Sequence, residues 1–251
     1  MKKIASSLLL IIVFLSLNSC NEKTLIQDMA IFDRLFIPAF YYSYMGDLEH
    51  TSMALYVLEN EWKKFEPIHQ QDHLSDDWNE TFRLVGTWLE GARCAIDDRD
   101  LVQALFQLDH VRYEMSELRY LHRKDDYYLD YLWDLEGAIG MAKDIANDSL
   151  TDIPDWRELF LSTSELRLAW VMLSEQEVDI DLYKINPEKA VLMLSRQSEL
   201  RESIFAYIHE INNGCGNSFV AASAKMEKAY FEYLKMFGNF EASTLYYAAT
   251  E

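Results

Sequence analysis

The residues of this chain whose types and spacing could hold a metal ion are its histidines and the carboxylates near them. His69 and His73 stand four positions apart, and on a helix this spacing would place both imidazoles on one face, where a metal could bind. Here the pair follows Pro67 in a polar stretch, so the helical geometry is not assured. Surface histidines without a metal are the preferred interpretation, and a metal site at His69 and His73 is the alternative.

Helix-bundle di-iron sites use a glutamate followed by a histidine three positions later, on each of two helices. The chain offers Glu66 with His69 and the imperfect pair Asp47 with His50. These pairs lie at opposite ends of one predicted helix, about 28 Å apart at 1.5 Å per residue. They cannot share a metal within one chain, which excludes a di-iron site of this design.

A third group with metal-ligand chemistry surrounds His110. Glu114 follows this histidine by one helical turn, and Glu117 follows by about another. His110 and Glu114 are therefore candidate metal ligands. An ion pair on the surface of a helix is nevertheless the preferred interpretation of this spacing.

The sequence carries none of the short motifs that identify common enzymes. It has no glycine-rich phosphate loop, no nucleophile elbow and no CxxC pair. Among 42 Asp and Glu residues, two carboxylates will meet in a groove by chance. An enzyme acting on glycans, for instance, is indicated only if a cleft holds a carboxyl group of raised pKa. We therefore predict no catalytic residue and no cofactor.

The most distinctive segment of the chain is rich in aromatic residues. Tyr127, Tyr128, Tyr131 and Trp133 fall within seven positions, among leucines and acidic residues. Packing in the core and at its rim is the preferred interpretation of these side chains. The functional alternative is an aromatic surface that binds a sugar or a partner protein.

Preceded by Leu118-Arg119, this aromatic segment resembles the end of small periplasmic four-helix-bundle proteins related to cytochrome b562. The resemblance covers about residues 30–146. In such cytochromes a histidine on the last helix and a methionine on the first bind haem. Here Leu135 and Glu136 stand where that histidine is expected, so the resemblance implies the bundle architecture and not haem ligation.

The elements that must position these residues are helices. Half of the 251 residues are hydrophobic, whereas Gly (8) and Pro (4) are too scarce for the many turns of a β or α/β fold. Apolar residues recur at spacings of three and four, and Asp47, Asp100 and Asn186 are typical helix N-caps. We predict an all-α, antiparallel bundle of about eight helices, at 31–44 with a break at Pro38, 48–65 ended by Pro67, 78–96, 101–121, 127–146, 156–174, 187–212 and 218–237.

The polar segment at 147–154 is the best internal boundary in this helical chain. It separates a predicted helical bundle at 31–147 from a second helical segment at 154–248, which either packs on the first or repeats it. Residues 25–97 and 155–238 share a similar order of helices and polar turns. Two related helical halves are therefore a hypothesis of the sequence.

The N-terminus has the three parts of an export signal. Lys2 and Lys3 precede an apolar run that ends near Leu17 and is short for a membrane span. Leu17-Asn18-Ser19-Cys20 then resembles the lipobox of bacterial lipoproteins. In that family a diacylglycerol is attached to the cysteine and the preceding peptide is removed. The resemblance implies a signal peptide at 1–19, lipidation of Cys20 and a tether at 20–30.

The predicted location of the protein is the bacterial cell envelope. Asn21 follows the cysteine where an aspartate would indicate retention in the inner membrane, so the outer membrane is the better prediction, with a periplasmic or surface face left open. In an oxidising compartment Cys94 and Cys215 could form a disulfide, although no local pattern shows that they meet.

A formal net charge of -19 limits the partners that this protein can have. A chain this acidic repels nucleic-acid phosphates and anionic lipid headgroups, so the sequence predicts no nucleic-acid binding and a membrane contact through the lipid alone. The leading interpretation is a non-catalytic lipoprotein that binds an envelope protein or a small ligand. A haem- or metal-binding bundle is the first alternative, and a glycan-acting enzyme is the second.

Overall fold

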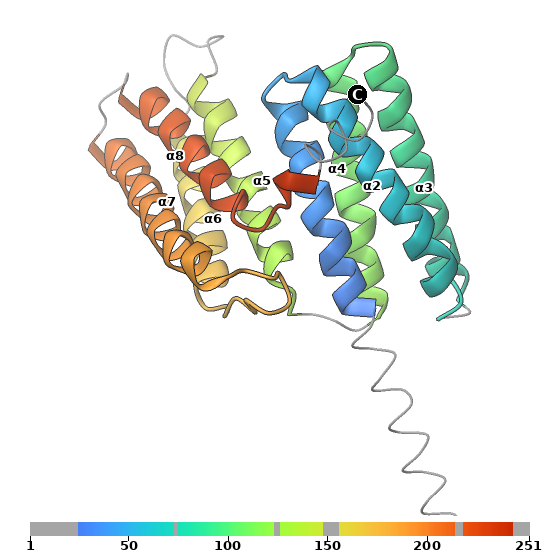
Figure 1. Cartoon of the computed structure of the whole chain (residues 1–251). Helices are drawn as coiled ribbons and strands as arrows, with labels where there is room; N and C mark the ends of the chain where they lie inside the picture. Colours follow the sequence, from blue (N-terminus) through green and yellow to red (C-terminus); the bar gives the residue numbers. More distant parts are fainter. Residues whose placement is uncertain (1–24, 73–74, 123–125, 148–155, 214–217, 243–251) are drawn as a thin grey trace, which may run out of the picture. The chain divides into compact units, whose positions relative to one another are not determined.

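All regular structure in this protein is helical wherever the chain is described. The computed structural model describes residues 25–72, 75–122, 126–147, 156–213 and 218–242 (Figure 1). These ranges contain eight helices of seven or more residues and no strand, so the prediction of an all-α fold with about eight helices is confirmed. The predicted signal peptide at 1–19 and Cys20 lie outside the described residues.

None of the helices in the described ranges is both long and apolar enough to cross a lipid bilayer.

Packing divides the chain into two compact units. The first consists of Met1–His122 with Asn239–Glu251, and the second of Arg123–Gly238. The division therefore falls next to residue 122, whereas the sequence indicated 147–154. The reason is that the fifth helix packs against helices that follow it in the chain.

The first unit contains the helix formed by residues 25–44 and three longer helices, α2 (Leu48–His69), α3 (Asp76–Asp97) and α4 (Leu101–Leu121). α3 packs along α4, and α2 packs against α3. The backbone N–H of Asn239 donates to the carbonyl of Arg34 over 2.7 Å and so returns the chain to this unit. The core is an aromatic cluster of Phe32, Phe36, Trp62, Phe65 and Phe82.

Two prolines lie inside helices of the first unit, where the sequence predicted a break. The first helix runs on through Pro38, and α2 continues past Pro67 to His69, so both predictions are wrong. A proline inside a helix costs about 3 kcal/mol, because it removes a backbone hydrogen bond and crowds the preceding turn. Around Pro38 this cost is offset by the burial of Phe36 and Phe40, at about 1.5–3 kcal/mol each.

The starts of these helices follow the sequence closely. Asp47, Ser75 and Asp100 precede α2, α3 and α4, and each side chain accepts a hydrogen bond from the backbone N–H three residues further on. This contact satisfies one of the amides that a helix start leaves without a partner. Polar N-caps were thus reliable signals in this chain.

A left-handed residue follows the first helix at Gly46 (φ 76°) and α3 at Arg99 (φ 61°), and another ends the turn formed by residues 180–184, at Lys184 (φ 51°). In each case the next backbone N–H bonds the carbonyl five residues back, as Asp47 to Tyr42, Asp100 to Ala95 and Ile185 to Ile180. This is the Schellman helix end, in which glycine is the favoured left-handed residue. The left-handed backbone of Arg99 is therefore explained by helix termination, and that of Lys184 by the same hydrogen bond at the end of a turn.

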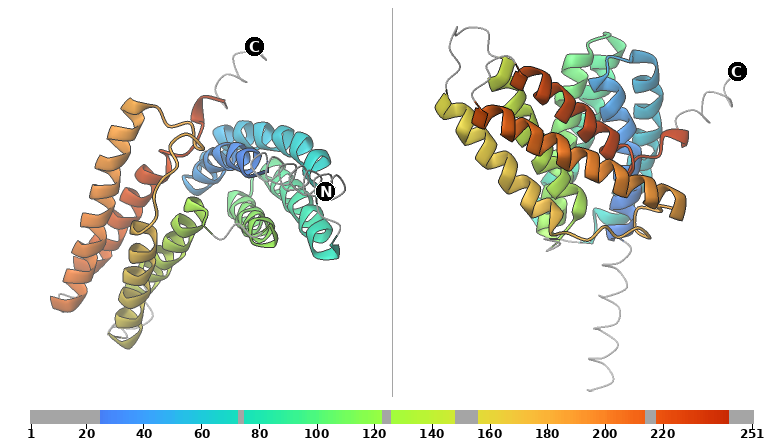
Figure 2. Two further views of the ribbon diagram at one scale, coloured as in Figure 1. Left: turned by 90° about the horizontal axis from the view of Figure 1, so that it is seen from below. Right: turned by 90° about the vertical axis from the view of Figure 1, so that its left-hand side faces the viewer.

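The second unit is a four-helix bundle of α5 (Tyr128–Asn147), α6 (Trp156–Ser174), α7 (Pro187–Asn213) and α8 (Ser218–Leu234). Each helix contacts two others, in the cyclic order α5, α6, α7, α8. Consecutive helices run antiparallel, as the colour gradient shows (Figures 1 and 2). Asn186 caps α7 as predicted, because its side chain accepts from the backbone N–H of Lys189 over 2.8 Å.

Tyrosines fill much of the core of the second unit. The Tyr128 and Tyr233 phenol oxygens lie 2.5 Å apart, and the ring of Phe237 contacts the rings of Tyr128, Tyr183 and Tyr233. Burial raises the pKa of Tyr128 to about 12, although the hydrogen bond with Tyr233 opposes this shift. Burial also raises the pKa of Tyr233, and Tyr128 adds to that shift. Both phenols are therefore neutral hydrogen-bonding groups at physiological pH.

Candidate functional site

His69 is a buried side chain that joins three parts of the first unit. Its Nδ1 lies 2.7 Å from a carboxylate oxygen of Asp72, and its Nε2 lies 2.9 Å from one of Asp28. Its backbone carbonyl accepts a hydrogen bond from the indole of Trp78 over 3.1 Å. The two carboxylates meet different nitrogens of the ring, so they do not converge on one point where an ion could bind. His73, the predicted partner of His69, lies outside the described residues.

Glu114 lies in a cluster on α3 and α4 together with His110. The ring of Trp88 stacks on His110 with the centroids 4.3 Å apart, and Glu114 itself is only 8% exposed. Burial raises the pKa of Glu114, the Trp88 indole and His110 oppose the shift, and Glu117 adds to it. Within the described ranges no group of three or more His, Cys, Asp or Glu residues has a geometry that could hold a metal.

The raised pKa of Glu114 meets one of the two conditions that an enzyme interpretation requires. The other condition is a cleft around the carboxyl group. Glu114 does not line the cavities found between α2 and α3, between α5 and α6, or between α6 and α7. The buried carboxyl group of Glu114 should instead make the stability of the first unit depend on pH.

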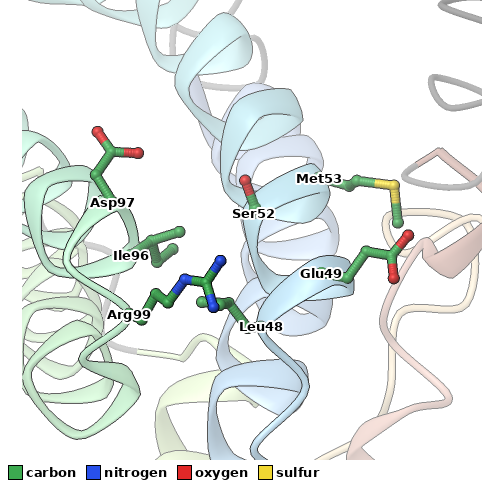
Figure 3. A pocket seen from close by; sticks show the side chains of 7 residues that line it. All are labelled: Leu48, Glu49, Ser52, Met53, Ile96, Asp97 and Arg99. Atoms are coloured by element: carbon green, nitrogen blue, oxygen red, sulfur yellow. The ribbon is translucent and has the colours of Figure 1, made fainter.

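The first cavity is a shallow groove in the first unit, of about 520 Å³, between the start of α2 and the end of α3 (Figure 3). The Arg99 side chain extends toward Ser52 and Leu48, while the Asp97 carboxylate points away from them. Glu49 also lines the groove, so its charges have both signs. The backbone position of Arg99 is explained by the end of α3. The mixed charges of the lining do not indicate one class of ligand.

The predicted aromatic residues are separated by the fold of α5. Tyr127 contacts Tyr183 ring to ring, and Tyr128 contacts Phe237, so both belong to the core of the second unit. Trp133 is also buried. Tyr131 alone is partly exposed, and it lines a groove on the surface of the second unit. The four side chains therefore do not form one aromatic surface.

The groove that contains Tyr131 lies between α5 and α6 and holds about 350 Å³. We call it the α5–α6 groove. Its residues recur at helical spacings of three and four, so each helix contributes one continuous face. They are Tyr131, Asp134, Ala138 and Met141 on α5, and Glu165, Leu168, Ala169 and Met172 on α6.

The walls of this groove are apolar and unusually exposed. Met141 is 49% exposed, Leu168 57% and Met172 43%. The rest of α6 has the same character, since Phe160, Leu161 and Val171 are exposed as well. A further groove of about 400 Å³ lies between α6 and α7 and is lined by Trp170, Ser174, Leu194, Gln197, Ser198 and Arg201. Helix α6 thus presents apolar surface outside the bundle core.

Tyr131 was among the residues predicted from the sequence, whereas the α6 half of the groove was not. A signal was present, because α6 has more apolar positions than one buried stripe requires. Leu159, Leu166 and Leu173 are buried, whereas Leu161 and Leu168 are exposed on another face. Which of these leucines face the core depends on how α6 packs against α5 and α7.

Cys94, for which a disulfide was predicted as one possibility, is exposed on α3 as a free thiol. Its proposed partner, Cys215, lies outside the described residues, as does Cys20. The disulfide and the lipidation therefore both stay predictions.

Comparison of this chain with protein-family models, with curated proteins and with solved structures found no match.

Proposed function

We propose that this chain is a lipid-anchored protein of the bacterial cell envelope whose helical body binds another protein through α6 and the α5–α6 groove. The anchor is Cys20, and the binding role needs no catalytic residue. The observation that carries the binding role is the exposed apolar surface of α6.

The exposed face of α6 supports a binding role because its apolar residues are clustered. Single apolar side chains on a protein surface are ordinary and need no explanation. Here five large ones are exposed on one helix of 19 residues, namely Phe160, Leu161, Leu168, Val171 and Met172. Clusters of this kind on a folded protein are typical of protein or ligand contact sites.

The N-terminal sequence supports the anchor. Leu17-Asn18-Ser19-Cys20 follows a basic and apolar leader, as in bacterial lipoproteins. Several acyl chains, at about 0.8 kcal/mol for each buried CH₂, would hold the body at a membrane without any contact from its acidic surface. A tethered protein with an apolar binding face would meet its partner at that membrane.

Site-specific photocrosslinking in cells tests the binding role. A photoreactive amino acid in place of Leu168, at the groove, is compared with one in place of Val102, which is 82% exposed on α4. We expect a discrete protein adduct from position 168 and none from position 102. Adducts of equal yield at both positions, or no adduct at position 168, would contradict the proposed binding face.

Mass spectrometry of the mature N-terminal peptide tests the anchor. We expect a peptide that begins at Cys20 and carries acyl chains, and we expect Cys20→Ser to move the protein out of the membrane fraction. An unmodified Cys20 in the mature protein would refute the anchor and leave the binding role to be judged by crosslinking alone.

A further inference from the structure

The α5–α6 groove has the length of a short docked helix. Its α5 side runs from Tyr131 to Met141, ten residues further on, which is about 15 Å at 1.5 Å per residue. This length matches about three turns of a helix lying along the groove. Exposed apolar residues continue along α6 from Phe160 to Met172, about 18 Å by the same rise. An extended occupant therefore covers more of this surface than a small molecule would.

The side chains of the groove suit a helical occupant. Ala138 and Ala169 contribute small side chains, which allow another backbone to approach closely. Met141, Met172 and Leu168 stand beside them as exposed apolar walls. Methionine is flexible and polarisable, so it adapts to different apolar partners. This is the arrangement in which an amphipathic helix lays its apolar face into a groove.

The charged residues that line the groove favour an occupant helix with positive charge. Both charged residues in its lining, Asp134 and Glu165, are acidic. The full chain has a net charge of -19, so its wider field also attracts cations and repels acidic partners. Rim charges of this kind chiefly set partner choice and the rate of association.

We infer that the α5–α6 groove binds a basic amphipathic helix of a partner protein, with its leucine-like residues on Leu168 and Met172 and its lysines or arginines near Asp134 and Glu165. The inference rests on the proposed binding function and adds the chemistry of the partner. A second copy of this chain is disfavoured as the occupant, because two such acidic grooves would repel each other.

Fluorescence anisotropy with designed peptides tests this inference. The probe is a labelled 18-residue helix with leucines on one face and lysines on the other, titrated with the purified full chain carrying Cys20→Ser so that no lipid is present. One comparison peptide has glutamates in place of the lysines. Another has the same leucines and lysines in an order that destroys the apolar face. We expect the lysine helix to bind at least tenfold more tightly than either comparison peptide.

Variants of the groove separate specific docking from general attraction to an acidic protein. Leu168→Gln with Met172→Gln should weaken binding of the lysine helix at least tenfold. Asp134→Asn with Glu165→Gln should weaken it about threefold to tenfold and make it less sensitive to salt. The control, Glu188→Gln with Glu202→Gln, removes two exposed charges from α7 outside the groove and should change binding less than twofold.

Three results would overturn the inference. The glutamate helix or the scrambled peptide could bind as tightly as the lysine helix. The control pair on α7 could weaken binding as much as the groove pair. The chain could also form a dimer by sedimentation that Leu168→Gln abolishes, which would assign the groove to a second copy. If crosslinking from position 168 succeeds while the lysine helix fails to bind, the binding function stands and the basic helix is refuted.

Discussion

The phenol groups of Tyr128, at the start of α5, and Tyr233, near the end of α8, share a hydrogen bond of 2.5 Å within the second unit. The two residues are 105 positions apart in the chain. Burial raises the pKa of both, so each hydroxyl keeps its proton and can serve the other as donor or acceptor. This pair is one of the links between the first and last helices of the bundle.

Replacing one member of this pair should cost more than replacing both. Tyr128→Phe leaves the Tyr233 hydroxyl buried without this partner, at a cost of about 1–3 kcal/mol of unfolding free energy. Tyr128→Phe with Tyr233→Phe removes both polar groups, and its cost should be less than the sum of the single changes. Urea unfolding of the wild type, both single variants and the double variant measures the coupling. Additive costs would show that the two hydroxyls do not depend on each other.

The left-handed residue at the end of α3 offers a stabilising change. Arg99 has φ 61°, where a side chain is strained and glycine is not. We expect Arg99→Gly to raise the unfolding free energy by about 0.5–1 kcal/mol, measured by urea unfolding. The matched control is Asp98→Gly, one residue earlier, where φ is -79° and glycine brings only flexibility. Equal effects from the two variants would disprove strain at Arg99.

Much of the fold could be predicted from local signals in the sequence. Asp47, Asp100 and Asn186 marked helix starts correctly, because an N-cap contact involves only residues within three positions. The interruption at Pro38 was predicted wrongly, because the packing that offsets a proline comes from residues distant in the chain. The division next to residue 122 was missed for the same reason, since α5 packs with α6 and α8.

The candidate site was predicted only in part. The sequence indicated an aromatic cluster, and its member Tyr131 does line the α5–α6 groove. The spacing of Tyr131, Asp134 and Met141 already placed them on one helix face. Whether that face is buried or open depends on where α6 lies beside it, and no local pattern in α5 contains this information.

The ion pair between Arg119 and Asp33 joins α4 to the first helix inside the first unit. The guanidinium Nη1 lies 3.3 Å from the carboxylate, and both side chains are buried. Asp33→Asn should lower the unfolding free energy by about 3–5 kcal/mol, because it takes an opposite charge away from a buried guanidinium. Glu80→Gln, at the exposed pair Glu80–Arg83, is the matched control and should cost far less, because solvent screens that pair. Thermal unfolding followed by circular dichroism compares the two, and similar losses would contradict the difference in burial.

Glu114 should make the stability of the first unit depend on pH. Burial raises its pKa above that of the unfolded chain, so folding disfavours the ionised carboxylate and favours the protonated acid. The stabilisation from this group is therefore complete at acidic pH and is lost as the pH rises through its folded-state pKa. Glu114→Gln mimics the protonated form, because its side chain has nearly the same shape and no charge.

We accordingly expect the Glu114→Gln variant to melt at a higher temperature than the wild type at pH 7, and at nearly the same temperature at pH 4. Differential scanning calorimetry at a series of pH values measures the two melting temperatures. Glu90→Gln, at an exposed site on the neighbouring α3, shows how much of any gain comes simply from lowering the net negative charge. If both variants gain equally at pH 7, the effect belongs to the charge of the whole chain. A gain specific to Glu114 that fades toward acid would instead assign it to the buried carboxyl group beside His110.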